Sequence, residues 1–260
     1  MGWNPFRRAP LLHVAHDEGE GPVAVFLHGV ASSSLTWTFV RPLLRDRYRC
    51  VCIDLLGFGG SPIPEKAEYT LKEHVDAVTR SIAALRLTEP FVLVGHSMGA
   101  LIATRYAARN PKRVRRLVLV SPPIYVNPEA LSDDRDRLVQ DFYLKAYRYI
   151  RENRDFTLRN GGIVGSLLQI PKFLDINERT WVPFVKSLEH TIESQTTISD
   201  LAALRMPVEI VTGTLDEFTS PGGIRIAERL RGVTVTRVRS ADHVVGKRLA
   251  RAVAAAVDDE

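Results

Sequence analysis

The stretch Phe91–Thr104 constrains the fold of this chain more than any other segment. Four consecutive apolar residues, Phe91–Val94, predict a short buried strand, and Ala100–Ala108 consists of good helix formers. Between them, Gly95-His96-Ser97-Met98-Gly99 fits the pattern G-x-S-x-G, in which a serine sits on a tight turn with its hydroxyl above the strand ends. The pattern also fits an ordinary strand-to-helix turn, because glycine and serine are common turn residues. Features elsewhere in the chain are needed to distinguish a nucleophile turn from an ordinary one.

Strand-like and helix-like segments alternate on both sides of this turn. The predicted strands are Leu11–His16, Val23–His28, Arg49–Asp54, Phe91–Val94, Leu117–Val120, Val208–Thr212 and Val233–Val238. Helices are predicted at Leu35–Leu44 and Leu71–Leu85, the second with Thr70 as N-cap and Glu73 at the capping-box position. The alternation predicts an α/β fold with a mostly parallel central sheet and helices on both faces. The polar turn at residues 17–22 further predicts that the first two strands form a hairpin.

The pattern changes after Ser121. Prolines interrupt the alternation, Glu129–Asn153 predicts a long amphipathic helix, and no strand-like run follows until Pro207–Thr212. We therefore predict a core formed by residues 1–121 and 201–260, with a helical lid inserted at residues 122–200. A second small helical domain is the alternative interpretation of this segment.

Composition excludes several classes of protein. The net charge of +5 over 260 residues is mild, and the single basic cluster, Lys112–Arg116, is expected to be a solvated connection and not a nucleic-acid interface. Met1–Pro10 holds no apolar run, so we expect no signal peptide, and no apolar segment is long enough to span a bilayer. Cys50 and Cys52 are predicted to be small buried hydrophobes on one face of a strand. We expect a cytoplasmic monomer or homodimer without a bound metal or organic cofactor.

Two further polar residues follow predicted strands at the same edge of the sheet as Ser97. Asp216 follows the strand Val208–Thr212, and His243 follows Val233–Val238. A serine hydroxyl becomes a good nucleophile when a base takes its proton and a third group orients that base. The order Ser97, Asp216, His243 on an alternating framework resembles the α/β-hydrolase superfamily over nearly the whole chain. The resemblance implies that Ser97 is the nucleophile, His243 the general base and then acid, and Asp216 the orienting carboxylate.

Each of these assignments has competitors. Glu217 and Asp54 are alternative carboxylates. The other histidines are His13, His16, His28, His74, His96 and His190. Adjacent side chains on such a turn diverge, so His96 is expected to pack or to cap. His74 and His190 lie in helical stretches and are expected at the surface or on the lid. Asp242 precedes His243 where the family commonly has glycine.

The resemblance also implies an oxyanion hole, which needs two preorganised donors. These would be the backbone N–H groups of Met98, at a helix N-terminus, and of Val30. Gly29 permits the bend of that loop and is expected to border the substrate, while His28 is expected to bind backbone groups. The loop Gly57-Phe58-Gly59 lacks the lysine and the spacing of a phosphate loop, so we predict no nucleotide binding.

The predicted reaction is hydrolysis of a carboxylic ester, thioester or lactone of a small apolar substrate through an acyl-enzyme. Dehalogenases and epoxide hydrolases of this fold carry aspartate in place of Ser97. Two alternatives stay open. Carbon–carbon hydrolases of ring-cleavage-type diketones often have tryptophan where Val244 stands here, and a small-molecule receptor or silent member of the fold would bind without turnover. Candidate pocket residues are the aromatic side chains of Phe142, Tyr143, Tyr147, Phe173, Trp181 and Phe184. Such aromatics can equally seal the lid to the core.

Overall fold

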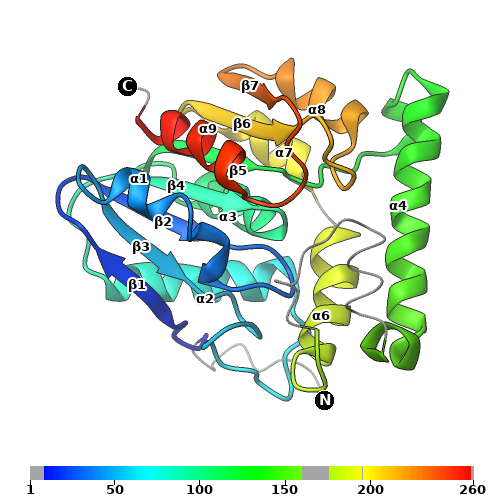
Figure 1. Cartoon of the computed structure of the whole chain (residues 1–260), viewed down its shortest axis with the longest axis horizontal. Coiled ribbons are helices and arrows are strands. Elements are labelled where there is room, and N and C mark those ends of the chain that lie inside the picture. Colours follow the sequence, from blue (N-terminus) through cyan, green and yellow to red (C-terminus); the bar gives the residue numbers. More distant parts are fainter. Residues whose placement is uncertain (1–8, 160–175, 195, 259–260) are drawn as a thin grey trace.

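A seven-stranded sheet forms the centre of the computed structural model, which describes residues 9–159, 176–194 and 196–258. Its strands are β1 (Val14–Glu18), β2 (Val23–Leu27), β3 (Arg49–Ile53), β4 (Phe91–His96), β5 (Val114–Val120), β6 (Val208–Gly213) and β7 (Val233–Val238). The spatial order is β1-β3-β2-β4-β5-β6-β7, and every neighbouring pair except β1 with β3 is parallel (Figure 1). The predicted α/β fold class is confirmed.

The predicted hairpin between the first two strands is wrong. β1 pairs antiparallel with β3, and β2 lies on the other side of β3, parallel to both β3 and β4. The turn at residues 17–22 does reverse the chain, but a strand that is buried on both faces belongs in the middle of the sheet. Ala24–Leu27 is fully buried, whereas β1 is only partly buried and forms the edge.

Helices cover both faces of the sheet (Figure 1). Successive strand residues point to opposite faces, so Val92 and Val94 pack on one side and Leu93 on the other. The helices of the first side are η1 (Ser34–Trp37), α1 (Arg41–Leu44) and α9 (Lys247–Asp258). Those of the second side include α2 (Leu71–Ala84), α3 (Met98–Arg109) and α8 (Pro221–Glu228). Cys50 and Cys52 are free and buried on the first side, as predicted.

Two predicted helices differ in their outcome. The capping box of α2 is confirmed, because the Glu73 amide donates to Thr70 Oγ1 and the Glu73 carboxylate accepts from the Thr70 amide. The helix predicted over Leu35–Leu44 instead divides into η1 and α1. Pro42 lies in the first turn of α1, where its missing N–H costs no intrahelical hydrogen bond.

Between β5 and β6 the described residues form helices and no strand. They include η2 (Pro128–Ala130), α4 (Asp134–Glu152), α6 (Trp181–Ser187), η3 (Leu188–Ile192) and α7 (Thr197–Ala203). The long helix α4 stands beside the sheet in Figure 1 and is joined to α8 by an ion pair between Asp136 and Arg225. The division into core and lid stays a prediction, and residues 160–175, with Phe173, lie outside the described residues.

His74 corrects a second prediction. It was expected at the surface or on the lid, but its exposed fraction is 0%. The helix α6 covers this part of α2, and His74 Nε2 lies 3.2 Å from Ser187 Oγ. Burial lowers the pKa of His74 to about 3, because a charged imidazole would lose its hydration there.

We expect His74→Gln to reduce the pH dependence of folding stability. The unfolded chain takes up a proton at the ordinary histidine pKa of ~6.5, whereas the folded protein does not until about pH 3. The stabilisation is therefore complete above pH ~6.5 and is lost as the pH falls toward 3. Between pH 8 and pH 5, one such group lowers the free energy of unfolding by about 2 kcal/mol.

Glutamine keeps an atom at the Nε2 position and does not titrate. Urea unfolding at both pH values should show a loss about 2 kcal/mol larger for the wild type; equal losses would contradict the assignment.

Candidate active site

Ser97 occupies the turn between β4 and α3 in a backbone conformation that is rare for a residue with a side chain. Its φ is 52° and its ψ is −123°, a combination that costs energy and is kept where the surroundings enforce it. The Ser97 amide donates to the Val120 carbonyl at 2.9 Å, and the residue is 7% exposed. A Cβ on Gly95 would lie 2.4 Å from the Gly99 carbonyl oxygen. The turn therefore requires glycine at that position.

Gly99 is equally constrained, and its replacement tests the turn. A Cβ on Gly99 would lie 2.3 Å from the His28 carbonyl oxygen, which is backbone and cannot move aside. We expect Gly99→Ala to lower the free energy of unfolding by about 3 kcal/mol, as for overpacking of a rigid site. Gly246→Ala is the matched control, because the nearest atom to its Cβ would be 4.0 Å away. Urea unfolding measures both, and an equal effect of the two substitutions would contradict the predicted clash.

Asp216 and His243 meet at the carboxyl ends of the neighbouring strands β6 and β7. His243 Nδ1 lies 2.9 Å from Asp216 Oδ1, which also accepts the Phe218 N–H at 3.0 Å. The Asp216 side chain is fully buried and that of His243 is 17% exposed. In this arrangement Nδ1–H of a neutral imidazole donates to the carboxylate, which leaves Nε2 as the acceptor. An imidazole in this state can accept a proton.

The pKa of Asp216 results from opposing effects. Burial alone would raise it, but the charge and hydrogen bond of His243 outweigh burial and hold the pKa below its ordinary value. The hydroxyl groups of Ser121 and Thr219 contribute in the same direction. Asp216 is therefore ionised at neutral pH and can stabilise a positive charge on His243.

His96 links the turn to the His243 loop. It directly precedes Ser97, and its Nε2 donates to the His243 carbonyl oxygen at 2.9 Å, with 4.9 Å between the ring centroids. The structure thus brings Ser97, His243 and Asp216 to one place. Among the described residues no hydrogen bond joins Ser97 Oγ to the imidazole; such contacts often tighten only when substrate binds.

The loop after β2 lies directly against Ser97. A Cβ on Gly29 would be 3.0 Å from Ser97 Cβ, so any larger residue would push the two apart. In the described part of the chain, the amides of Val30 and Met98 donate to no other residue. His28 fixes this loop: its Nδ1 donates to the Gly29 carbonyl at 2.7 Å, and its Nε2 accepts the Leu55 N–H at 2.8 Å. The expected backbone contacts of His28 are thus observed.

The competing carboxylates have other partners. Asp54 Oδ2 lies 3.1 Å from His13 Nδ1 and accepts the Gly60 N–H, while its Oδ1 accepts the Ser34 N–H. These contacts hold three segments of the chain together, and Asp54 has no hydrogen bond or ion pair with His243 among the described residues. Glu217 instead borders a cavity.

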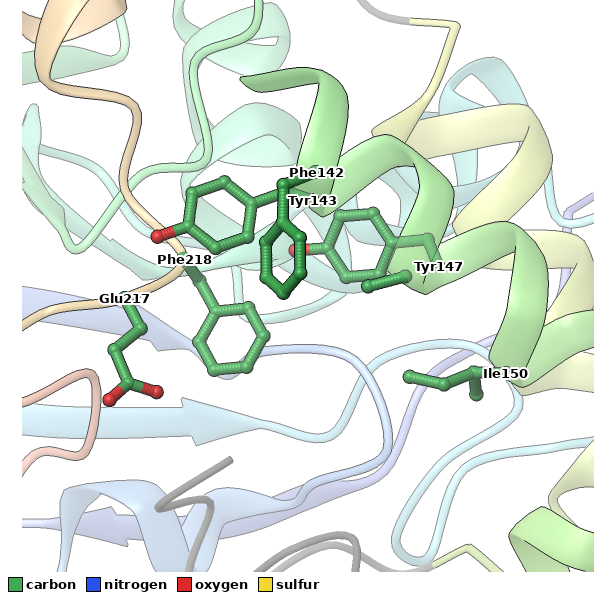
Figure 2. A pocket seen from close by; sticks show the side chains of 7 residues that line it. Phe142, Tyr143, Tyr147, Ile150, Glu217 and Phe218 are labelled. Carbon is green, nitrogen blue, oxygen red and sulfur yellow. The ribbon is translucent and has the colours of Figure 1, made fainter. Parts of the chain in front are cut away.

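This cavity lies between α4 and the loop after β6 (Figure 2). Its volume is about 240 Å³, and its lining is mostly apolar: Phe142, Tyr143, Ala146, Tyr147, Ile150, Glu217 and Phe218. Figure 2 shows the rings of Phe142, Tyr143 and Tyr147 facing the loop that carries Phe218. The predicted pocket residues Phe142 and Tyr143 are therefore here. Trp181 is not among the lining residues and packs against Phe184, with 6.0 Å between ring centroids.

Sequence reasoning missed two groups of residues at this site. Phe218 lines the cavity and contacts His243 edge-on, with centroids 5.0 Å apart, so it joins the cavity to the imidazole. Ser121 and Thr219 place buried hydroxyls beside Asp216. Ser121 could have been predicted, because it directly follows β5. That strand neighbours β6, after which Asp216 lies.

The described residues hold neither a cluster of metal ligands nor a membrane-spanning helix. No group of three or more His, Cys, Asp or Glu side chains is arranged to hold a metal ion within the described ranges. No helix in the same part of the chain combines the length and apolarity needed to cross a membrane.

Comparison with known proteins gives consistent matches. The family model described as alpha/beta hydrolase fold matches residues 22–160, just over half of the chain. A probable lysophospholipase of Arabidopsis thaliana, BODYGUARD 4, is 44% identical over 103 residues, which are 39% of this chain and 25% of the plant protein. Pimeloyl-[acyl-carrier protein] methyl ester esterase of Aeromonas hydrophila is 33% identical over 141 residues, or 51% of this chain and 54% of the esterase. The match thus spans only about a quarter of the plant relative and about half of the esterase.

Solved structures match over almost the whole chain. A bromoperoxidase from Bacillus anthracis superimposes with a TM-score of 0.73 at 20% identity and covers 94% of each chain. The structure of DBJA gives a TM-score of 0.72 at 23% identity, covering 97% of both chains. At such identities the likeness shows the fold.

Proposed function

Because the chain belongs to the alpha/beta hydrolase family, we propose that it is a serine hydrolase that cleaves a carboxylic ester, thioester or lactone of a small apolar substrate. The observation that carries the proposal is the 2.9 Å contact between His243 and Asp216 beside the strained turn at Ser97. A base oriented by a buried carboxylate is the device that activates a serine hydroxyl. The similarity to a probable lysophospholipase and to a methyl ester esterase supports ester cleavage in particular.

In the proposed reaction Ser97 Oγ attacks the substrate carbonyl carbon while His243 Nε2 takes the hydroxyl proton. Asp216 stabilises the imidazolium that forms, and the amides of Val30 and Met98 donate to the oxyanion. The intermediate collapses, the bond from carbonyl carbon to the leaving oxygen breaks, and His243 gives its proton to the leaving alcohol. A water molecule, deprotonated by His243, then attacks the acyl carbon. The bond from that carbon to Ser97 Oγ breaks, His243 returns the proton to Oγ, and the acid is released.

The lining of the cavity supports the proposal that the substrate carries an apolar group. Its lining by Phe142, Tyr143 and Phe218 offers aromatic surface, and Phe218 also contacts His243. A hydrocarbon chain bound there would gain free energy from leaving water and would end near the reacting bond. Gly29 would border the substrate carbonyl, because it lies against Ser97.

Turnover of p-nitrophenyl acetate and p-nitrophenyl butyrate tests the proposal. We expect hydrolysis of both esters, with a lower KM for butyrate because its longer chain reaches the apolar cavity. Cleavage of a vinylogous diketone together with inert esters would overturn ester hydrolysis in favour of carbon–carbon hydrolysis. Binding of these compounds without any turnover would favour a receptor.

A further inference from the structure

His96 lies among three segments of the candidate site. Its Nε2 contacts the main chain of the His243 loop. On its other side, a Cβ on Gly29 would be 3.2 Å from His96 Nδ1, so the ring packs against the loop after β2. The Trp37 ring meets it edge-on, with centroids 6.3 Å apart. His96 is 8% exposed and belongs to the rigid end of β4.

The chemistry of His96 excludes it as the base for Ser97. Its contact on the His243 side is a carbonyl oxygen, which only accepts, so Nε2 carries the proton and Nδ1 the lone pair. Nδ1 is buried and has no hydrogen-bond partner among the described residues. Burial and the nearby His243 lower the pKa of His96 to about 3, with Asp216 opposing and His28 adding to the shift. His96 is therefore neutral at pH 7 and donates one fixed hydrogen bond.

That hydrogen bond supplies something the Asp216 contact lacks. Asp216 holds the imidazole of His243 by a hydrogen bond at one atom, Nδ1, and the Phe218 ring packs beside it, but neither contact holds the main chain of His243. The hydrogen bond from His96 Nε2 to the His243 carbonyl oxygen fixes the main chain of His243, while Asp216 fixes the far side of its ring at Nδ1. Nε2 of His243 then points in one direction.

We propose that His96 is a positioning residue, which holds the backbone of His243 through its Nε2–H so that the base stays directed at Ser97. The inference rests on the proposed serine hydrolase function. It assigns a role to the second residue of Gly95-His96-Ser97-Met98-Gly99 that goes beyond packing.

Three substitutions separate positioning from packing. His96→Gln places an amide N–H at the position of Nε2 and keeps the hydrogen bond. His96→Asn carries the same amide but ends at the position of Nδ1, too short to reach the His243 carbonyl. His96→Met fills a similar volume without a donor. We expect His96→Asn and His96→Met to lower kcat for p-nitrophenyl butyrate by about 30- to 100-fold, the loss that follows when a reacting group shifts by about 1 Å. Their KM should stay within about 2-fold of the wild type, because His96 does not line the cavity. His96→Gln should stay within about 5-fold of the wild-type kcat.

Thermal unfolding of each variant identifies those that are folded, and the comparison with glutamine needs only one folded variant without the contact. Equal kcat for glutamine and for that variant, or a loss confined to KM, would overturn the positioning role. Labelling of wild-type Ser97 by a fluorophosphonate separates a failure of the His96 role from a failure of the proposed hydrolase function. Labelled wild type with equal rates in the variants overturns only the role of His96, whereas wild type that is neither labelled nor active overturns the proposed function itself.

Discussion

Replacing Ser97 with alanine is expected to lower kcat for p-nitrophenyl butyrate by about 10⁵-fold or more. Without the hydroxyl no acyl-enzyme forms, and the remaining rate comes from the oxyanion donors and substrate binding alone. The loss should fall on kcat with little change in KM, because Ser97 is not among the residues that line the cavity. Steady-state kinetics at pH 8 measure both constants.

Ser199→Ala is the control for this substitution. Ser199 lies in α7 and is exposed, and its Oγ donates to the carbonyl of Thr196, the residue before that helix. Within the described ranges it has no hydrogen bond with any of the proposed catalytic residues. It should keep wild-type rates. A Ser97→Ala protein that retains a tenth of the wild-type kcat would rule out Ser97 as the nucleophile.

Replacing Asp216 with asparagine should lower kcat by about 10⁴-fold while the protein stays folded. Asparagine presents an amide that can donate to Nδ1, which favours the tautomer with the proton on Nε2, where it cannot accept from Ser97. It also removes the negative charge that faces the imidazolium. The wild-type carboxyl has a pKa below its ordinary value, so this charge is present throughout the neutral range, and its loss should lower the rate at every pH from 6 to 9.

Asp200→Asn is a matched control, because it removes a carboxylate that pairs with Arg105 outside the candidate site. Both proteins lose one ion pair, so a general electrostatic effect would appear in both. A loss of similar size in the two variants would contradict the role of Asp216. So would an Asp216→Asn rate that recovers fully at high pH.

The sheet was predictable from the sequence because its signals are local. Apolar runs such as Phe91–Val94 and the capping residues Thr70 and Glu73 determine their own secondary structure, and alternation then implies parallel strands. Strand order is not local. Nothing in the turn at residues 17–22 indicates that β3 separates β1 from β2, because that outcome depends on which strand buries both faces.

The burial of single side chains escaped prediction for the same reason. His74 has the sequence surroundings of a surface residue on an amphipathic helix, and its burial arises only when α6 packs over α2. The contacts of Phe218 and of His96 with His243 also join loops that follow different strands. The tight turn at Ser97, by contrast, was predictable because five consecutive residues, Gly95–Gly99, determine it. The division at residues 122–200 stays a prediction.

The whole proposed reaction depends on Ser97 being a nucleophile that His243 activates. Incubation with a fluorophosphonate, followed by mass spectrometry of the peptide that contains Ser97, tests it most directly. We predict one adduct per chain, located on Ser97, absent from Ser97→Ala and formed about 10³-fold or more slowly in His243→Gln, since that variant lacks the base. A folded wild-type protein without an adduct on Ser97, or one labelled equally fast without His243, would contradict the claim.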